Sequence, residues 1–365
     1  MRRRSFLAAL SALAASGEAA RLAHAAPLRY PDVLPGARLL FPRDYGAHAD
    51  FRIEWWYITG WLDARKEEPR GFQITFFRAR APEDTSNPSR FAARQIIFAH
   101  AALGDPRLSR LLHEERAARA ALDLAGAAEA RTEAWLDDWR LEQTERGYRA
   151  SIAAREFGLA LDFDAAGEVM LQGEAGVSRK GPRPREASYY YSQPQMPVRG
   201  EIVQAGARTQ VSGKAWLDHE WSSSYLAPEA AGWDWTGINL ADGGALMLFR
   251  MRARRANAAG GVYYAGGTLR SADGRLRRFA LREIRFEPLR SWRSPRTGVE
   301  YPVAMRIVAG DLEWRLEPLM DDQELDARAS TGTIYWEGAV RAFSNDAEVG
   351  RGYLELTGYW RAMKL

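Results

Sequence analysis

The feature that most constrains the fold is a period-two alternation of apolar and polar residues along most of the chain after Pro27. Residues 54–62 form one such segment, rich in aromatic and β-branched side chains, and residues 71–77 form the next after a polar turn. Further segments recur at a spacing of about 8–12 residues with turn residues between them. Because side chains on a strand alternate between two faces, this pattern predicts an all-β fold of antiparallel barrels or sandwiches.

The two halves of the chain share a sequence pattern. Each half contains a Trp, a Thr-Gly pair and an acidic turn, followed by Phe-Arg-x-Arg at residues 77–80 and 249–252. This repeat indicates two related β-domains in tandem. Two stretches depart from the alternation. Residues 108–122 place Leu, Ala, Glu and Arg at helical spacing and predict a short helix. Residues 181–197 contain four prolines and predict a crossing between sheets or a linker.

The N-terminus has the composition of a cleaved export signal. Three arginines at residues 2–4 precede the mostly apolar residues 8–15, and a small-residue site follows at residues 23–25. The sequence Arg-Arg-Ser-Phe-Leu at residues 3–7 favours the twin-arginine route over an ordinary signal peptide. We therefore expect residues 1–25 to be removed and the protein to be periplasmic or secreted. A membrane-associated transport partner would suit that location, and the sequence after the leader predicts no transmembrane segment.

Composition excludes several classes of function. The formal net charge is +4, of which residues 1–25 contribute +3, and the mature chain has no run of basic residues, so we expect no nucleic-acid binding. Cysteine is absent, which rules out disulfides, thiolate zinc sites and cysteine nucleophiles. The histidines lack metal-ligand spacing, and no phosphate-binding glycine motif follows a strand. The sequence therefore predicts no metal and no cofactor.

The densest polar cluster lies at residues 216–224. Asp218, His219 and Glu220 stand there between two tryptophans. On a strand, Asp218 and Glu220 share one face, while His219 and Trp221 share the other. One hypothesis makes these three polar residues a catalytic acid–base set, because a histidine beside a carboxylate can move protons. The alternative is that they hold the two domains together through hydrogen bonds.

A second cluster surrounds Glu54, beside Trp55 and Trp56. It is either a buried acid in a ring-lined cavity or a glutamate paired with arginine at the end of a barrel. Three consecutive tyrosines at residues 189–191 could also line a cavity, although alternating rings are common in a core. The residues predicted to contact a ligand are Glu54, Trp55, Trp56, Tyr190, Tyr191, Trp221, Trp233 and Trp235.

These clusters resemble, in this order, the motifs of the AttH-like, carotenoid 1,2-hydratase-related family. The segments that carry the resemblance are residues 48–60, 190–192, 218–221, 233–235, 335–338 and 352–359. The resemblance implies two tandem lipocalin-like (calycin-type) antiparallel β-barrels after the signal peptide. It places an N-terminal domain at residues 27–224 and a C-terminal lipocalin-like domain at residues 225–365.

The resemblance also implies an activity for one branch of the family. Carotenoid hydratases add water to an isolated carbon–carbon double bond without a cofactor, with a His-x-Trp pair and, on a later strand, a Tyr near an Asp. His219 and Trp221 match the pair, but residues 246–252 contain neither Tyr nor Asp. Four acids could replace the missing proton donor: Asp218, Glu220, Asp234 and Glu54.

We therefore expect an exported lipocalin-like protein that binds an apolar ligand, isoprenoid or lipid-like, in an aromatic-lined cavity. The alternative is a cofactor-free hydro-lyase.

Overall fold

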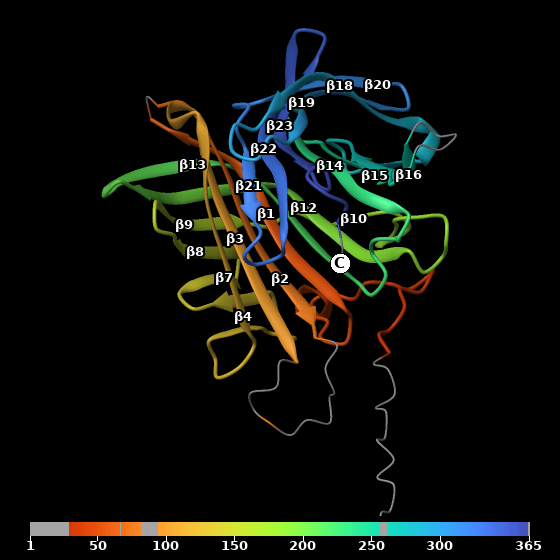
Figure 1. Cartoon of the computed structure of the whole chain (residues 1–365), viewed down its shortest axis with the longest axis horizontal. Helices are drawn as coiled ribbons and strands as arrows, with labels where there is room; N and C mark the ends of the chain where they lie inside the picture. The colour runs from red at the N-terminus through yellow and green to blue at the C-terminus, as the bar shows by residue number, and fades with distance from the viewer. Residues whose placement is uncertain (1–28, 66, 82–88, 90–93, 256–260, 364–365) are drawn as a thin grey trace, which may run out of the picture.

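Antiparallel strands in two sheets make up most of the protein (Figure 1). The computed structural model describes residues 29–363 except 66, 82–88, 90–93 and 256–260. The prediction of an all-β fold with two antiparallel units is confirmed. No helix in the described residues has the length and apolar character needed to cross a membrane. The predicted leader lies outside the described residues.

The first sheet forms a nearly closed barrel. Its strands are β1 (Ile53–Ala64), β2 (Arg70–Arg80), β3 (Gln95–Asp105), β4 (Arg110–Arg119), β5 (Ala125–Ala127), β6 (Glu133–Leu136), β7 (Trp139–Gln143), β8 (Gly147–Ala153), β9 (Phe157–Asp164), β10 (Met170–Leu171), β11 (Val177–Arg179), β12 (Ala187–Gln204) and β13 (Ala207–Ser222). The order is β4-β3-β2-β1-β13-β12-β9-β8-β7-β6-β5, and β5 and β6 return to contact β3 and β4. Side chains complete this closure: the Arg116 guanidinium lies over the Trp139 ring, 4.4 Å from its centroid.

The second sheet repeats the arrangement in which the first strand pairs with the last. Its strands are β14 (Ala230–Leu240), β15 (Ala245–Ala253), β16 (Val262–Arg270), β17 (Leu276–Phe279), β18 (Ile284–Arg293), β19 (Glu300–Ala309), β20 (Leu312–Pro318), β21 (Glu324–Ala327), β22 (Thr333–Ser344) and β23 (Ala347–Leu356). β14 pairs with β23, as β1 pairs with β13 in the first sheet. The short 3-10 turns are η1 (Arg43–Tyr45), η2 (Pro106–Leu108) and η3 (Leu281–Glu283). The chain passes from one sheet to the other over residues 223–229.

Three large clusters of buried side chains position the site. One fills the inner face of the first sheet, around Trp56 and Trp139, and a second fills the inner face of the second sheet, around Trp336. The third lies between the sheets and includes Trp216 and Trp235. β22 and β23 contact β2 and β1, so the two sheets pack against each other along these strands.

The helix predicted at residues 108–122 is wrong. η2 covers only Pro106–Leu108, and β4 then pairs with β3 in register, with Glu115 opposite His100. Leu111 and Leu112 are buried. Helix propensity differs by less than about 1 kcal/mol per residue, so pairing with a neighbouring strand overrides it.

The crossing or linker predicted at residues 181–197 is also only partly right. β12 begins at Ala187 and continues past Pro197 to Gln204. Pro194 is accommodated because the register with β13 shifts between Gln193 and Met196, whereas Pro197 lies in the ladder opposite Lys214. A bulge leaves one residue outside the ladder, and a proline there removes no ladder hydrogen bond.

Candidate functional site

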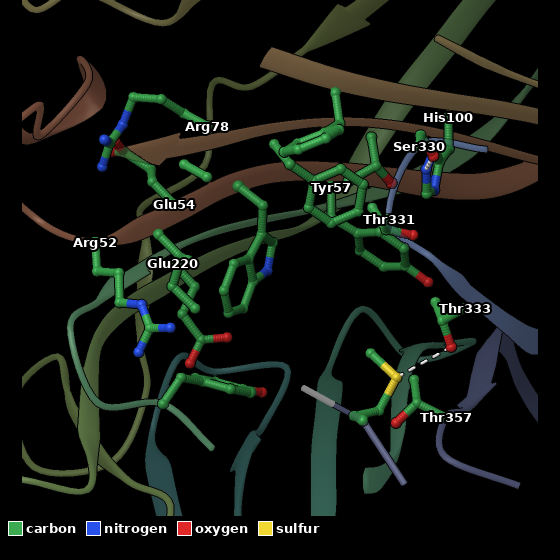
Figure 2. A pocket seen from close by; sticks show the side chains of 18 of the residues that line it. Arg52, Glu54, Tyr57, Arg78, His100, Glu220, Ser330, Thr331, Thr333 and Thr357 are labelled. Carbon is green, nitrogen blue, oxygen red and sulfur yellow. Dashed lines mark hydrogen bonds and ion pairs between the residues drawn. The ribbon is translucent and has the colours of Figure 1, made fainter. Parts of the chain in front are cut away.

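A cavity of about 510 Å³ lies between the two sheets (Figure 2). The first sheet contributes residues of β1, β2, β3 and β13 to its walls, and the second sheet contributes residues of β14, β22 and β23. Apolar and aromatic side chains dominate the lining, with carboxyl groups among them. Figure 2 shows Arg52, Glu54, Arg78 and Glu220 towards one end and Thr333 towards the other.

Strand alternation decides which residues reach this cavity. On β13, Asp218 and Glu220 line the cavity, whereas His219 belongs to the opposite face, inside the first barrel. On β1, Tyr57 lies opposite Asp218, and Trp56 lies opposite His219. The predicted division of faces on this strand is confirmed.

Asp218 accepts hydrogen bonds from three neutral donors. Its Oδ1 accepts from Ser192 Oγ at 2.5 Å and from Trp216 Nε1 at 2.7 Å, and its Oδ2 accepts from Tyr190 Oη at 2.7 Å. Burial raises the pKa of Asp218 to about 7, and the nearby Glu220 acts in the same direction. A carboxyl group in this setting is an acid near neutral pH.

Glu220 has a basic partner. Lys180 Nζ lies 2.7 Å from Glu220 Oε1, and the Ser188 hydroxyl donates to the same oxygen. The Lys180 ammonium lies 4.9 Å from the centroid of the Tyr190 ring and 4.2 Å from that of Phe249. Burial lowers the pKa of Lys180 and raises that of Glu220, while their mutual attraction opposes both shifts. This ion pair supports the cavity wall from behind.

Glu337 and Glu355 form a pair of acids on the second sheet. They are direct cross-strand partners on β22 and β23, and both line the cavity; Glu337 is buried and Glu355 is half-buried. Trp233 Nε1 donates to Glu355 Oε2 at 2.8 Å. Glu337 Oε1 has no hydrogen-bond partner among the described residues. Burial, followed by the charge of Glu355, raises the pKa of Glu337 well above its usual value, and burial raises that of Glu355 to about 7.

Aromatic rings surround these acids in edge-on contacts. The Tyr225 ring lies 5.0 Å from Trp55 and 5.4 Å from Trp233. Tyr57 meets Trp235 at 5.4 Å with an interplanar angle of 87°. All five rings line the cavity, so a ligand there would contact aromatic side chains from both sheets.

A polar bridge connects the sheets near the threonine end. His100 on β3 lies 2.7 Å from Tyr335 Oη through Nδ1 and 2.8 Å from Ser330 Oγ through Nε2. The Ser330 hydroxyl in turn donates to Glu115. Burial lowers the pKa of His100 to about 3, so the imidazole is neutral and connects the two sheets through hydrogen bonds.

His219 belongs to a separate network inside the first barrel. Its Nε2 lies 2.8 Å from Glu54 Oε1, which also lies 2.8 Å from His48 Nδ1, and Arg78 Nε donates to Glu54 Oε2 at 2.8 Å. Although burial opposes it, hydrogen bonds from the two histidines and the charge of Arg78 hold the pKa of Glu54 well below its usual value. Burial lowers the pKa of His219 to about 4.

The ligand atoms of His48, Glu54 and His219 lie within 4.8 Å of one another, which is close enough for a shared metal ion. These atoms bond one another, and the Arg78 cation contacts the second carboxylate oxygen. A metal ion would have to displace these hydrogen bonds and lie beside a fixed positive charge. The arrangement therefore suits a structural ion network.

The structure separates the predicted site residues into two groups. Those that line the cavity are Glu54, Trp55, Asp218, Glu220, Trp233 and Trp235. Trp56, Tyr191, His219 and Trp221 lie in the first barrel, and Tyr190 stands behind Asp218 as its hydrogen-bond donor. From the sequence, Asp234 was one candidate for the missing proton donor. In the structure its carboxylate accepts a hydrogen bond from Arg250 Nε at 2.6 Å. Sequence reasoning missed Glu337 and Glu355 as site residues, although both lie in motifs that carried the family resemblance.

Fold and site together define a class of two-sheet β-proteins with an acidic, ring-lined cavity between the sheets. A family model described as AttH-like matches residues 32–359, and the chain belongs to this family. The resemblance noted in the sequence is thereby confirmed. A search of curated proteins found no match.

Solved structures share the fold. The crystal structure of an AttH from Nitrosomonas europaea is 49% identical, with a TM-score of 0.84, and the match covers 90% of this chain and 99% of that one. Kievitone hydratase from Nectria haematococca matches at 12% identity with a TM-score of 0.67 over 92% of this chain and 98% of that one. CghA with Sch210972 matches at 12% identity with a TM-score of 0.53 over 91% and 98% of the two chains. The last two likenesses concern the fold alone.

Proposed function

We propose that this protein binds an apolar small molecule, isoprenoid or lipid-like, in the cavity between its sheets. The observation that carries the proposal is the 510 Å³ cavity with its largely apolar and aromatic lining. Small-molecule sites have volumes of about 300–1,000 Å³ and combine apolar walls with a few polar groups. The two sheets supply opposite walls. We also propose that residues 27–224 and 225–365 are two domains, in which case each domain supplies one wall.

A second candidate function is acid-catalysed hydration of an isolated double bond. It is favoured by Asp218, a carboxyl group with a pKa of about 7 in an apolar cavity. In this reaction the acid gives its proton to one alkene carbon, and water adds its oxygen to the other. Water then returns a proton to the carboxylate, so no cofactor is consumed. Kievitone hydratase has a hydratase name and the same fold, which supports this candidate by analogy only.

We also propose that the protein acts after export, in the periplasm or outside the cell. This proposal is supported by residues 1–25, with their twin-arginine pattern and small-residue cleavage site. An exported protein with an apolar ligand would need to exchange that ligand with a membrane or a membrane-associated partner, because apolar molecules are poorly soluble in water.

Binding is tested by filling the cavity. Ala79 lines it, so Ala79→Trp should weaken binding of the neutral apolar fluorophore N-phenyl-1-naphthylamine by about tenfold or more. Ala160→Trp, at an exposed position on β9, is the matched control and should bind as the wild type does. Native mass spectrometry and solvent extraction of protein purified from its own compartment should also find a co-purified apolar molecule. Equal dye binding by both variants would place the ligand elsewhere.

Hydration is tested with lycopene or neurosporene in water labelled with heavy oxygen. The hydrated product should carry one labelled oxygen, and Asp218→Asn should reduce turnover by about 10² or more, the usual effect of removing a general acid. Retention of dye binding by this variant would show that the cavity is intact. Absence of labelled product from the wild type would leave binding as the function for these substrates.

A further inference from the structure

We infer that the cavity favours apolar ligands that carry a positive charge, such as a long-chain amine or quaternary ammonium, over neutral or anionic ligands of equal length. The inference rests on the proposed binding function and specifies the chemistry of the ligand. Three features carry it: acids without a basic partner, rings placed to contact a cation, and a buried carboxylate oxygen without a donor.

Acidic groups of the lining outnumber the basic groups that pair with them. Arg78 pairs with Glu54, and Lys180, behind the wall, pairs with Glu220. Three further carboxyl groups of the lining have no ion-pair partner in the described part of the chain: Asp218, Glu337 and Glu355. Asp218 is satisfied by neutral donors, so the Glu337–Glu355 pair is the open acidic feature of the cavity.

The basic groups of the lining are concentrated elsewhere. All three arginines of the lining lie within residues 52–80, at the β1–β2 wall, whereas Glu337 and Glu355 come from the second sheet. Arg80 contacts Asp50 at 3.0 Å, and Arg52 is exposed. Burial and mutual repulsion favour the neutral forms of Glu337 and Glu355, and a ligand cation beside them would favour ionisation of the pair. The resulting attraction would act in a low-dielectric interior, where charge interactions are strongest.

The rings near these acids suit a cation. Trp233 donates to Glu355 through Nε1, so its indole lies directly beside the acid pair. Trp55, Tyr57, Tyr225 and Trp235 line the same cavity. Tryptophan and tyrosine faces attract ammonium groups, and such aromatic cages are used to recognise quaternary ammonium ligands.

One carboxylate oxygen is left open. Glu337 Oε1 is buried and meets no donor at hydrogen-bond distance among the described residues. The hydroxyl of Tyr57, which also lines the cavity, lies near this carboxyl group and likewise has no partner at that distance. A buried acceptor without a donor lowers stability, so a ligand that supplies an N–H donor or a positive charge would recover part of that free energy. An anionic or purely apolar ligand would not.

The test compares three ligands with the same decyl chain below their micelle concentrations: decyltrimethylammonium, decanol and decanoate. Quenching of tryptophan fluorescence and calorimetry at pH 7.5 measure their affinities. We expect the ammonium to bind at least about tenfold more tightly than decanol, and decanoate to bind most weakly. In the double variant Glu337→Gln, Glu355→Gln, the preference for the ammonium should vanish while decanol still binds. Glu313→Gln, at an exposed position on β20, should keep the preference.

Each outcome decides a different claim. Equal affinities for decyltrimethylammonium and decanol would overturn this inference and leave the proposed binding function standing. Tighter binding of decanoate would overturn it as well and would make the arginines at the β1–β2 wall the recognising groups. Failure of all three ligands to bind, with no N-phenyl-1-naphthylamine bound either, would refute the proposed function together with the inference. The wild-type series decides the question even if the double variant does not fold.

Discussion

Replacement of Asp218 by asparagine should make the protein less sensitive to pH. The pKa of Asp218 rises from a usual value of 3.8 to about 7 because its carboxyl group is buried. Below pH 3.8 the carboxyl group is neutral in both the folded and the unfolded states. Between pH 3.8 and about 7 it ionises only in the unfolded chain, so the free energy of unfolding falls as the pH rises. Above pH 7 the loss is complete.

The magnitude follows from this shift. Each pKa unit corresponds to about 1.4 kcal/mol, so the loss between pH 5 and pH 8 is about 3 kcal/mol. Asparagine does not titrate, and it keeps an oxygen that can accept from Ser192 Oγ and Trp216 Nε1. Its amide nitrogen replaces the oxygen that accepts from Tyr190, so the variant starts with a penalty of about 1–3 kcal/mol.

Urea unfolding at pH 5 and pH 8 measures the effect. The stability difference between Asp218→Asn and the wild type should move in favour of the variant by about 3 kcal/mol from pH 5 to pH 8. Asp346→Asn, at an exposed loop position, is the matched control and should show no such movement. A stability difference for Asp218→Asn that is the same at both pH values would refute the reasoning, because it would mean that burial does not raise this pKa.

Three further predictions concern groups outside the cavity. His219→Asn should lower the free energy of unfolding by about 1–3 kcal/mol and leave dye binding unchanged, since His219 lies inside the first barrel. Loss of dye binding by the folded variant would contradict this prediction. Lys180→Met should destabilise the protein by about 3–5 kcal/mol, because Glu220 loses its buried partner. Adding Glu220→Gln should restore part of the lost stability, as thermal unfolding would measure, and no recovery would exclude the ion-pair explanation. Replacement of Arg3 and Arg4 by Lys should trap the precursor in the cytoplasm, as cell fractionation would show, and normal export of that variant would rule out the twin-arginine route.

Strand content and side-chain faces were predictable from local sequence. Alternation on residues 54–62 and 216–221 predicts strands, and the observed register places Asp218 and Glu220 together on one face. The alternation works because a strand turns successive side chains to opposite sides whatever its neighbours are. The helix predicted at residues 108–122 was wrong because local sequence does not report strand pairing. This segment is a strand since β4 pairs with β3, and that pairing depends on residues outside the segment.

The location of the cavity was decided by tertiary structure. A lipocalin-like resemblance suggests a ligand inside a barrel, but Trp56, Trp139 and other large rings fill the interior of the first barrel, and the cavity lies between the sheets. Glu337 and Glu355 stand more than a hundred residues from Asp218 and meet it only because β22 and β23 pack against β2 and β1. Local sequence patterns report which face a side chain takes, whereas which faces meet depends on how whole sheets pack, and burial between those sheets is what raises the pKa values of the acids.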